Sequence, residues 1–221
     1  MASNTKPNFS STYSKANEII VKSLVISTFP FSPIDLVKEQ SAIKCRTYNM
    51  ARKYGIDISA FGSESATIFE YAGRQIIFYD DNKPMTHVKY SILHELGHTL
   101  NNHNFSVTDK EIYDRYEVET NYFTAQLLMP EQVLREFTNR GIRITKEFLI
   151  QHFEVSETAA KKRIETLAKT TVEWRSRQEK EFDDIILYKF AAFIDSICPP
   201  RKNYFDFEDE YDRQRKRDSW F

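Results

Sequence analysis

Cysteine is scarce in this sequence. Only two occur in 221 residues, Cys45 and Cys198, far apart and with no Cys-x-x-Cys spacing. Two isolated cysteines exclude a disulfide framework and a structural zinc knuckle, and they favour a reducing compartment. Long apolar runs are missing too, since no stretch approaches the roughly 18 apolar residues of a membrane span. Residues 1–14 lack the basic start and apolar core of a secretory signal, so we expect a cytoplasmic protein.

An excess of charge of either sign is also absent. The 31 Lys and Arg residues nearly balance the 32 Asp and Glu residues, which gives a net charge of −1. The chain as a whole therefore favours neither nucleic acid nor a membrane surface as its partner, and any partner has to be inferred from local features. The length suits one domain with additions, or two small domains, and is sufficient for a hydrophobic core.

Histidine is uncommon, yet two of the five histidines stand four residues apart. These are His94 and His98, with Glu95 between them. Residues four apart on an α-helix lie on one face, so both imidazoles can reach one metal ion. Glu95 projects about 100° further round the helix, where its carboxylate can hydrogen-bond a water at the metal. The spacing predicts a zinc site with His94 and His98 as ligands and Glu95 as general base.

The flanking residues support a helix with one buried side. Apolar residues recur there at helical spacing: Ile92, Leu93, Leu96 and Leu100. The side that carries the histidines is left facing a polar environment. The alternative, a chance meeting of surface side chains, is rare in a chain with so few histidines.

A hydrolytic zinc site usually has three protein ligands and leaves the fourth position to water. Two residues can supply the third ligand. His103 follows His98 by five residues, and Glu117 lies on a second predicted helix that begins near residues 108–109 and ends at residue 129. The spacing alone leaves both open.

Two motifs together resemble the ImmA/IrrE family of bacterial and phage metallo-endopeptidases. They are His94-Glu-Leu-Gly-His98 and Glu117-x-Glu119-x-Asn121-x-Phe123-x-Ala125-x-Leu127-Leu-Met-Pro130. The resemblance runs from about residue 33 to about residue 169. It implies one zinc ion (Zn²⁺) whose third ligand is a glutamate on the second helix, which makes Glu117 the ligand and Glu119 the runner-up, ahead of His103. It also implies that Asn121 supports the ligands from behind. Thr120 and Thr124 depart from the alanines usual in the family, a change that affects packing more than chemistry.

The resemblance implies a zincin-like metallopeptidase of the α+β class, with a small antiparallel or mixed sheet. Residues 33–55 predict one helix before this sheet, and residues 67–71 and 75–79 predict a hairpin. In zinc peptidases of this type a sheet edge lies along the cleft and binds the substrate as an added strand. The candidate edge consists of Gln75, Ile76, Ile77, Phe78 and Tyr79. The alternative is that both strands are interior and serve only the core.

Residues 145–169 predict two helices joined at residues 153–156, which is the shape of a helix-turn-helix. Lys161, Lys162 and Arg163 cluster on the second of these helices and can meet phosphates, although like charges are common on solvated faces. We expect four parts: a leader and helix in residues 1–30, the zinc metallopeptidase core in residues 31–140, a helix-turn-helix-like part in residues 141–175, and a C-terminal helix and tail in residues 176–221.

The most favoured interpretation is an intracellular zinc-dependent endopeptidase. The resemblance implies a narrow protein substrate, typically a helix-turn-helix repressor of a phage, a mobile element or a stress regulon. The alternative is a regulator that binds DNA or a repressor without cutting, with a zinc site that is structural. Glu95 argues against this alternative, because a structural site is closed by a fourth protein ligand and needs no base.

Overall fold

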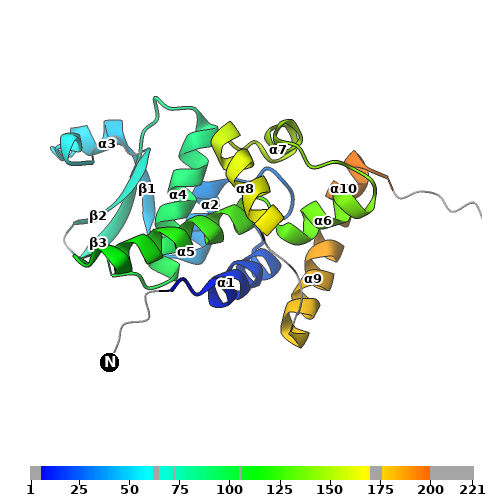
Figure 1. The fold of residues 1–221 in the computed structure, drawn as a ribbon. Coiled ribbons are helices and arrows are strands. Elements are labelled where there is room, and N and C mark those ends of the chain that lie inside the picture. The colour runs from blue at the N-terminus through cyan, green and yellow to red at the C-terminus, as the bar shows by residue number, and fades with distance from the viewer. Residues whose placement is uncertain (1–5, 62–64, 72, 105, 170–175, 200–221) are drawn as a thin grey trace, which may run out of the picture.

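The computed structural model describes residues 6–61, 65–71, 73–104, 106–169 and 176–199. A small sheet lies at one end of the molecule, and helices make up the rest (Figure 1). At this level the predicted α+β class is confirmed. None of the described helices is both long and apolar enough to span a membrane. The predicted tail after residue 199 lies outside the described residues, and the predicted division into four parts stays a prediction.

The strands are β1 (Lys44–Thr47), β2 (Ala66–Tyr71) and β3 (Arg74–Tyr79). The helices of the N-terminal half are α1 (Phe9–Lys22), α2 (Pro33–Gln40), α3 (Tyr48–Lys53) and the short 3-10 helix η1 (Ile58–Phe61). The two longest described helices are α4 (Met85–Leu100) and α5 (Lys110–Leu128). The remaining helices are α6 (Glu131–Asn139), α7 (Lys146–Phe153), α8 (Glu157–Lys169), α9 (Arg177–Lys189) and α10 (Ala191–Ile197).

The central strand of the sheet is β3. It pairs in parallel with β1, where Lys44 is opposite Ile76, and antiparallel with β2, where Ala66 is opposite Tyr79. Both sides of β3 are therefore hydrogen-bonded, and an added strand cannot pair with it. The prediction of a substrate-binding edge is wrong for Ile76, Ile77, Phe78 and Tyr79, which have partners on both sides. Gln75 belongs to the same central strand and pairs with Glu70 of β2. Within the described residues, the edges of the sheet are β1 and β2.

The single helix predicted for residues 33–55 is also wrong, because the chain forms α2, β1 and α3 there. Helix α2 ends at Ser41, whose hydroxyl donates to the Val37 carbonyl. Helix α3 begins after Thr47, whose hydroxyl accepts from the Met50 amide. Between these helices, Lys44–Thr47 form a strand because they pair with β3, a contact between segments about thirty residues apart in the chain.

The two faces of the sheet are covered by different elements. Side chains alternate between the faces along a strand, so Ile77 and Phe78 point in opposite directions. Ile77 packs in the main core with Ile92 and Leu93 of α4. Phe78 packs in a smaller cluster with Tyr48 of α3 and Phe61 of η1. The sheet thus holds α4 against one of its faces.

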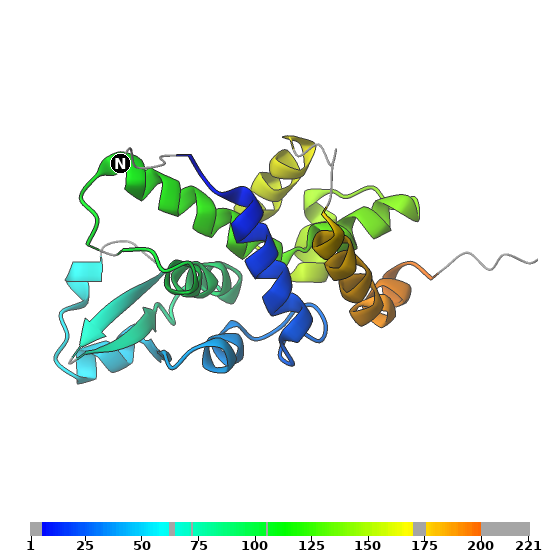
Figure 2. The same cartoon turned by 90° about the horizontal axis from the view of Figure 1, so that it is seen from below.

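Helix α5 crosses close to α4, and α1 packs against α5 and α9 (Figure 2). The close approach of α4 and α5 depends on Gly97. A Cβ atom at this position would lie 2.9 Å from Thr120 Cγ2 and 3.0 Å from Phe123 Cδ1. Any larger residue would push the two helices apart.

Helices α7 and α8 contact each other, and the Ser156 hydroxyl accepts from the Ala159 amide at the start of α8. A helix-turn-helix role for this pair stays a prediction. The predicted cluster of three cations on α8 is wrong for Arg163, which is only 1% exposed. Its guanidinium donates to Gln126 Oε1 (2.6 Å) and to the Met129 carbonyl (3.0 Å). Arg163 therefore points into the protein and not toward a ligand outside it.

Candidate metal centre

Helix α4 carries the first motif with its histidines on one side and its apolar residues on the other. Ile92, Leu93 and Leu96 are buried in the main core. On the other side, the Nε2 atoms of His94 and His98 lie 3.0 Å apart, with the two rings edge to face. The burial of the apolar side thus orients both imidazoles toward one point.

Helix α5 brings a carboxylate to the same point. It begins after Asp109, whose side chain accepts from the Glu111 and Ile112 amides and caps the helix. Two turns further on, Glu117 Oε2 lies 3.3 Å from His94 Nε2, and Glu117 Oε1 lies 3.3 Å from His98 Nε2. Within the described part of the chain, His94, His98 and Glu117 form the one group of His, Cys, Asp and Glu side chains placed to hold a metal ion.

The geometry of this group fits zinc. Tetrahedral zinc binds nitrogen and oxygen at about 2.0–2.1 Å, so its ligand atoms lie about 3.3 Å from one another. The observed separations of 3.0 to 3.3 Å are close to this value. Hydrogen bonds from His94 and His98 hold the pKa of the Glu117 carboxyl well below its usual range, so the carboxylate is charged at neutral pH. Two imidazoles and one carboxylate are a donor set found in catalytic zinc sites.

Glu95 lies outside this group of ligand atoms. Its Oε2 accepts a hydrogen bond from the Ile68 amide of β2, at 3.1 Å. The amide that reaches Glu95 is turned away from β3, on the open edge of the sheet. The predicted general base therefore lies between the metal group and an edge strand.

His103 and Glu119, the other two candidates for third ligand, lie behind His98. The Nδ1 atoms of His103 and His98 are 3.0 Å apart, and His103 Nε2 lies 3.2 Å from Glu119 Oε2. Glu119 Oε1 in turn accepts from the Asn8 amide at 2.8 Å. If His98 Nε2 binds the metal, the ring proton of His98 is on Nδ1, and this N–H donates a hydrogen bond to His103 Nδ1. Burial lowers the pKa of His103 to about 4, so His103 is neutral and can accept this hydrogen bond.

Three further side chains contact residues of the site in ways that sequence reasoning did not predict. The Tyr90 hydroxyl donates to Asn121 Oδ1 (2.8 Å), and the Tyr90 ring stacks near His94 with the centroids 6.4 Å apart. Asn121, expected behind the ligands, thus contacts a ring that packs on one of them. The available signal was the position of Tyr90, four residues before His94 and so on the same helical face.

The other two side chains surround His103. The Tyr116 ring stacks on the His103 ring with the centroids 4.1 Å apart. The Thr120 hydroxyl lies 3.2 Å from His103 Nδ1. Thr120 is one of the two positions where the sequence departs from alanine, and this departure was the signal that it has a partner.

Comparison with known proteins identifies a family for this chain. Residues 51–165, more than half of the chain, match the family model described as Peptidase_M78: IrrE N-terminal-like domain. The matched segment includes β2, β3, the whole of α4 and the whole of α5, and so all of the residues that form the metal group. No curated protein matches the chain.

Proposed function

The chain belongs to the IrrE N-terminal-like family of metallopeptidases, Peptidase_M78, and on this premise we propose that it is a zinc-dependent endopeptidase. The observation that carries the proposal is the convergence of His94, His98 and Glu117 on one point. The carboxylate of Glu95 lies beside this group and is not part of it. A ligand set with an open position and an adjacent base is what metal-assisted hydrolysis requires.

In this proposal His94, His98 and Glu117 hold one Zn²⁺. When bound, zinc acts as a Lewis acid that activates a water molecule and polarises the scissile carbonyl. Glu95 takes a proton from the attacking water and passes it to the leaving amine. His103 and Glu119 fix the ring of His98, because a ligand imidazole that donates its second N–H keeps one tautomer and one orientation.

We also propose that the substrate pairs with β2 in place of β3. Strand β2 is an edge of the sheet, and its Ile68 amide already reaches Glu95. An extended substrate that adds to this edge passes directly beside the base. Backbone pairing of this kind supplies affinity with little preference for sequence.

For the substrate we propose a helix-turn-helix repressor of a phage, a mobile element or a stress regulon. The resemblance of the two motifs to the ImmA/IrrE family supports this choice.

The test is incubation of the zinc-loaded chain with a small helix-turn-helix protein encoded beside it, followed by measurement of intact mass. We expect one cut, which chelator prevents and which Glu95→Gln abolishes. Rapid digestion of casein at many sites would indicate a general protease and would remove the repressor from the proposal.

A further inference from the structure

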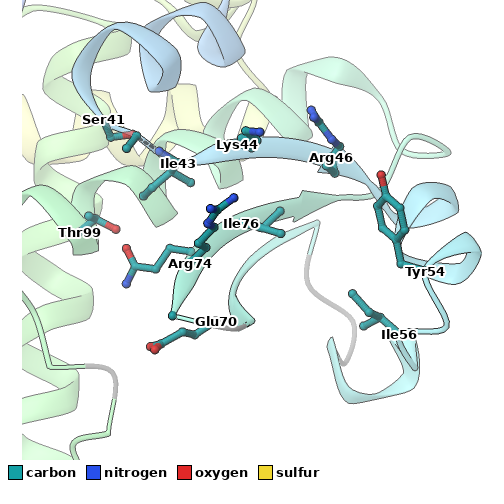
Figure 3. A pocket seen from close by; sticks show the side chains of 13 residues that line it. Ser41, Ile43, Lys44, Arg46, Tyr54, Ile56, Glu70, Arg74, Ile76 and Thr99 are labelled. Carbon is teal, nitrogen blue, oxygen red and sulfur yellow. Dashed lines mark hydrogen bonds between the residues drawn. The ribbon is translucent and has the colours of Figure 1, made fainter.

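A cavity of about 1180 Å³ opens at the end of the sheet where β2 turns into β3 (Figure 3). Its wall includes Thr99 of α4, which directly follows the ligand His98 and lies one helical turn after Glu95. From there the wall passes Glu70 at the end of β2 and reaches Tyr54 beyond α3. The cavity is thus a neighbour of the metal centre and extends away from it round the end of the sheet.

Three cationic residues line this cavity: Lys44, Arg46 and Arg74. The register of the sheet places them on one face. Lys44 is opposite Ile76, and positions two apart on a strand share a face, so Arg46 and Arg74 lie on the same side as Ile76. Neighbouring positions on one strand face are about 7 Å apart. Figure 3 shows the three side chains arising from β1 and β3 around Ile76.

These charges are not compensated within the described part of the chain. None of the three side chains forms an ion pair with a carboxylate there, and Arg46 donates only to the carbonyl of Cys45 (2.9 Å). Glu70 is the one carboxylate in the described lining, but it pairs with Gln75 in the register and so belongs to the other face of the sheet. Adjacent like charges on a sheet are destabilising. The arrangement therefore points to an anionic ligand.

We propose that this cavity binds an acidic segment of the protein substrate, to one side of the bond that is cut. The proposal rests on the proposed function, because the occupant is the substrate of that reaction. A peptide that lies along β2 passes from Ile68 to Glu70 and then enters the cavity. With a strand rise of about 3.4 Å, the cations are reached roughly three to six residues from the scissile bond.

The shape and chemistry of the cavity favour a peptide over a small anion. Its volume exceeds the roughly 300–1,000 Å³ of a typical small-molecule pocket. Its walls also include Ile43, Ile56 and Ile76, which would contact apolar side chains that alternate with the acidic ones. Pairing with β2 gives affinity, and the three cations give the preference for sequence that backbone pairing lacks.

Binding can be tested without cleavage, in the zinc-loaded Glu95→Gln chain. The probes are two fluorescein-labelled twelve-residue peptides that differ only in four consecutive residues, glutamates in one and glutamines in the other. Each probe is made with this block at either end, and affinity is measured by fluorescence anisotropy at low salt. We expect the glutamate peptide to bind about tenfold more tightly, and this preference to fall as salt is added. The triple change Lys44→Glu, Arg46→Glu and Arg74→Glu should abolish it.

A matched control carries the same change of charge outside the cavity, at the exposed residues Lys110, Arg143 and Lys180. This control should keep the preference, and melting temperatures show whether both variants are folded. Equal affinity for the two peptides, or equal loss of preference in both triple variants, would overturn the proposal. Tighter binding of inorganic phosphate or of a short single-stranded DNA than of the acidic peptide would overturn it in favour of a phosphate ligand. No part of this assay requires cleavage. A chain that does not cleave in the presence of zinc would therefore overturn the proposed function, and a chain that shows no preference for the acidic peptide would overturn the proposal for the cavity, so the two outcomes remain distinguishable.

Discussion

Glu95 can be replaced without disturbing the proposed ligands, because its carboxylate lies outside their group and accepts from the Ile68 amide. Glu95→Gln preserves the shape of the side chain and removes the base. We expect the variant to bind zinc and to fold normally, while the rate of cleavage falls by about 10²-fold or more. Zinc content by mass spectrometry and the rate of product formation check this. A variant that is fully active at normal zinc content would show that another group accepts the proton.

The third ligand can be identified by comparing two glutamates that stand two residues apart on one helix. Glu117 touches both histidines of the metal group, whereas Glu119 contacts His103 behind them. We expect Glu117→Ala to abolish stoichiometric zinc binding. Glu119→Ala and His103→Ala should weaken zinc affinity by about ten- to a hundredfold, as is usual for residues that orient a ligand.

Competition with a chromophoric chelator measures these zinc affinities, and circular dichroism shows whether each variant is folded. Loss of zinc from the His103→Ala variant together with normal zinc in the Glu117→Ala variant would reverse the assignment.

At the scale of elements, the metal group depends on the crossing of α4 and α5, since each helix supplies part of it. Gly97→Ala would place a methyl group 2.9 Å from Thr120 Cγ2 and so force the helices apart. We expect a loss of stability of about 1–3 kcal/mol, partly offset by the better helix propensity of alanine. Zinc affinity should fall as well, because Glu117 moves away from the two histidines.

A second change tests the cause. Thr120→Ser removes the methyl group that the new side chain would meet and keeps the hydroxyl near His103. Added to Gly97→Ala, it should restore part of the stability and part of the zinc affinity. Melting temperature and chelator competition measure both quantities. Unchanged zinc affinity in Gly97→Ala would show that the close approach of these helices does not determine the site.

The sequence predicts an element when the residues that cause it lie within one segment, and fails when the element depends on contacts with a distant segment. Helix α4 and the position of its two histidines on one face follow from spacing within one segment, and the match to the family confirms the resemblance inferred from the two motifs. Strand β1 is four residues long and forms by pairing with β3, so no periodicity within residues 33–55 indicates it. The same pairing makes β3 the central strand, which the hairpin pattern alone could not show. Likewise, the different neighbours of Glu117 and Glu119 result from how α5 packs.

At the scale of the whole molecule, the segment that matches the family is completed by the flanking helices. The match covers residues 51–165, whereas α1 and α9 lie outside it. A buried polar network joins these parts. Gln126 of α5 donates to Asn17 of α1 (2.8 Å), and Gln132 of α6 donates to Asp183 of α9 (2.9 Å). The hydrophobic core is likewise continuous from Ala16 of α1 to Ile194 of α10.

Arg163 is a buried cation in this network, and its replacement tests whether the network holds the molecule together. Arg163→Ala leaves Gln126 Oε1 and the Met129 carbonyl without the guanidinium that now donates to them. Gln126 Oε1 keeps the hydrogen bond from the Glu131 amide (3.2 Å), whereas the Met129 carbonyl loses its donor. A buried acceptor without a partner costs about 1–3 kcal/mol, and the lost volume adds a cavity. We expect the free energy of unfolding to fall by roughly 3–5 kcal/mol, measured by urea denaturation.

The neighbouring exposed residue Lys162 serves as the control. Lys162→Ala should change the free energy of unfolding by no more than about 0.5 kcal/mol. Because Arg163 does not belong to the metal group, the Arg163→Ala chain that remains folded should still bind one zinc ion. Equal stability of the two variants would mean that the helices are held by apolar packing alone, and that burying this cation contributes nothing to their arrangement.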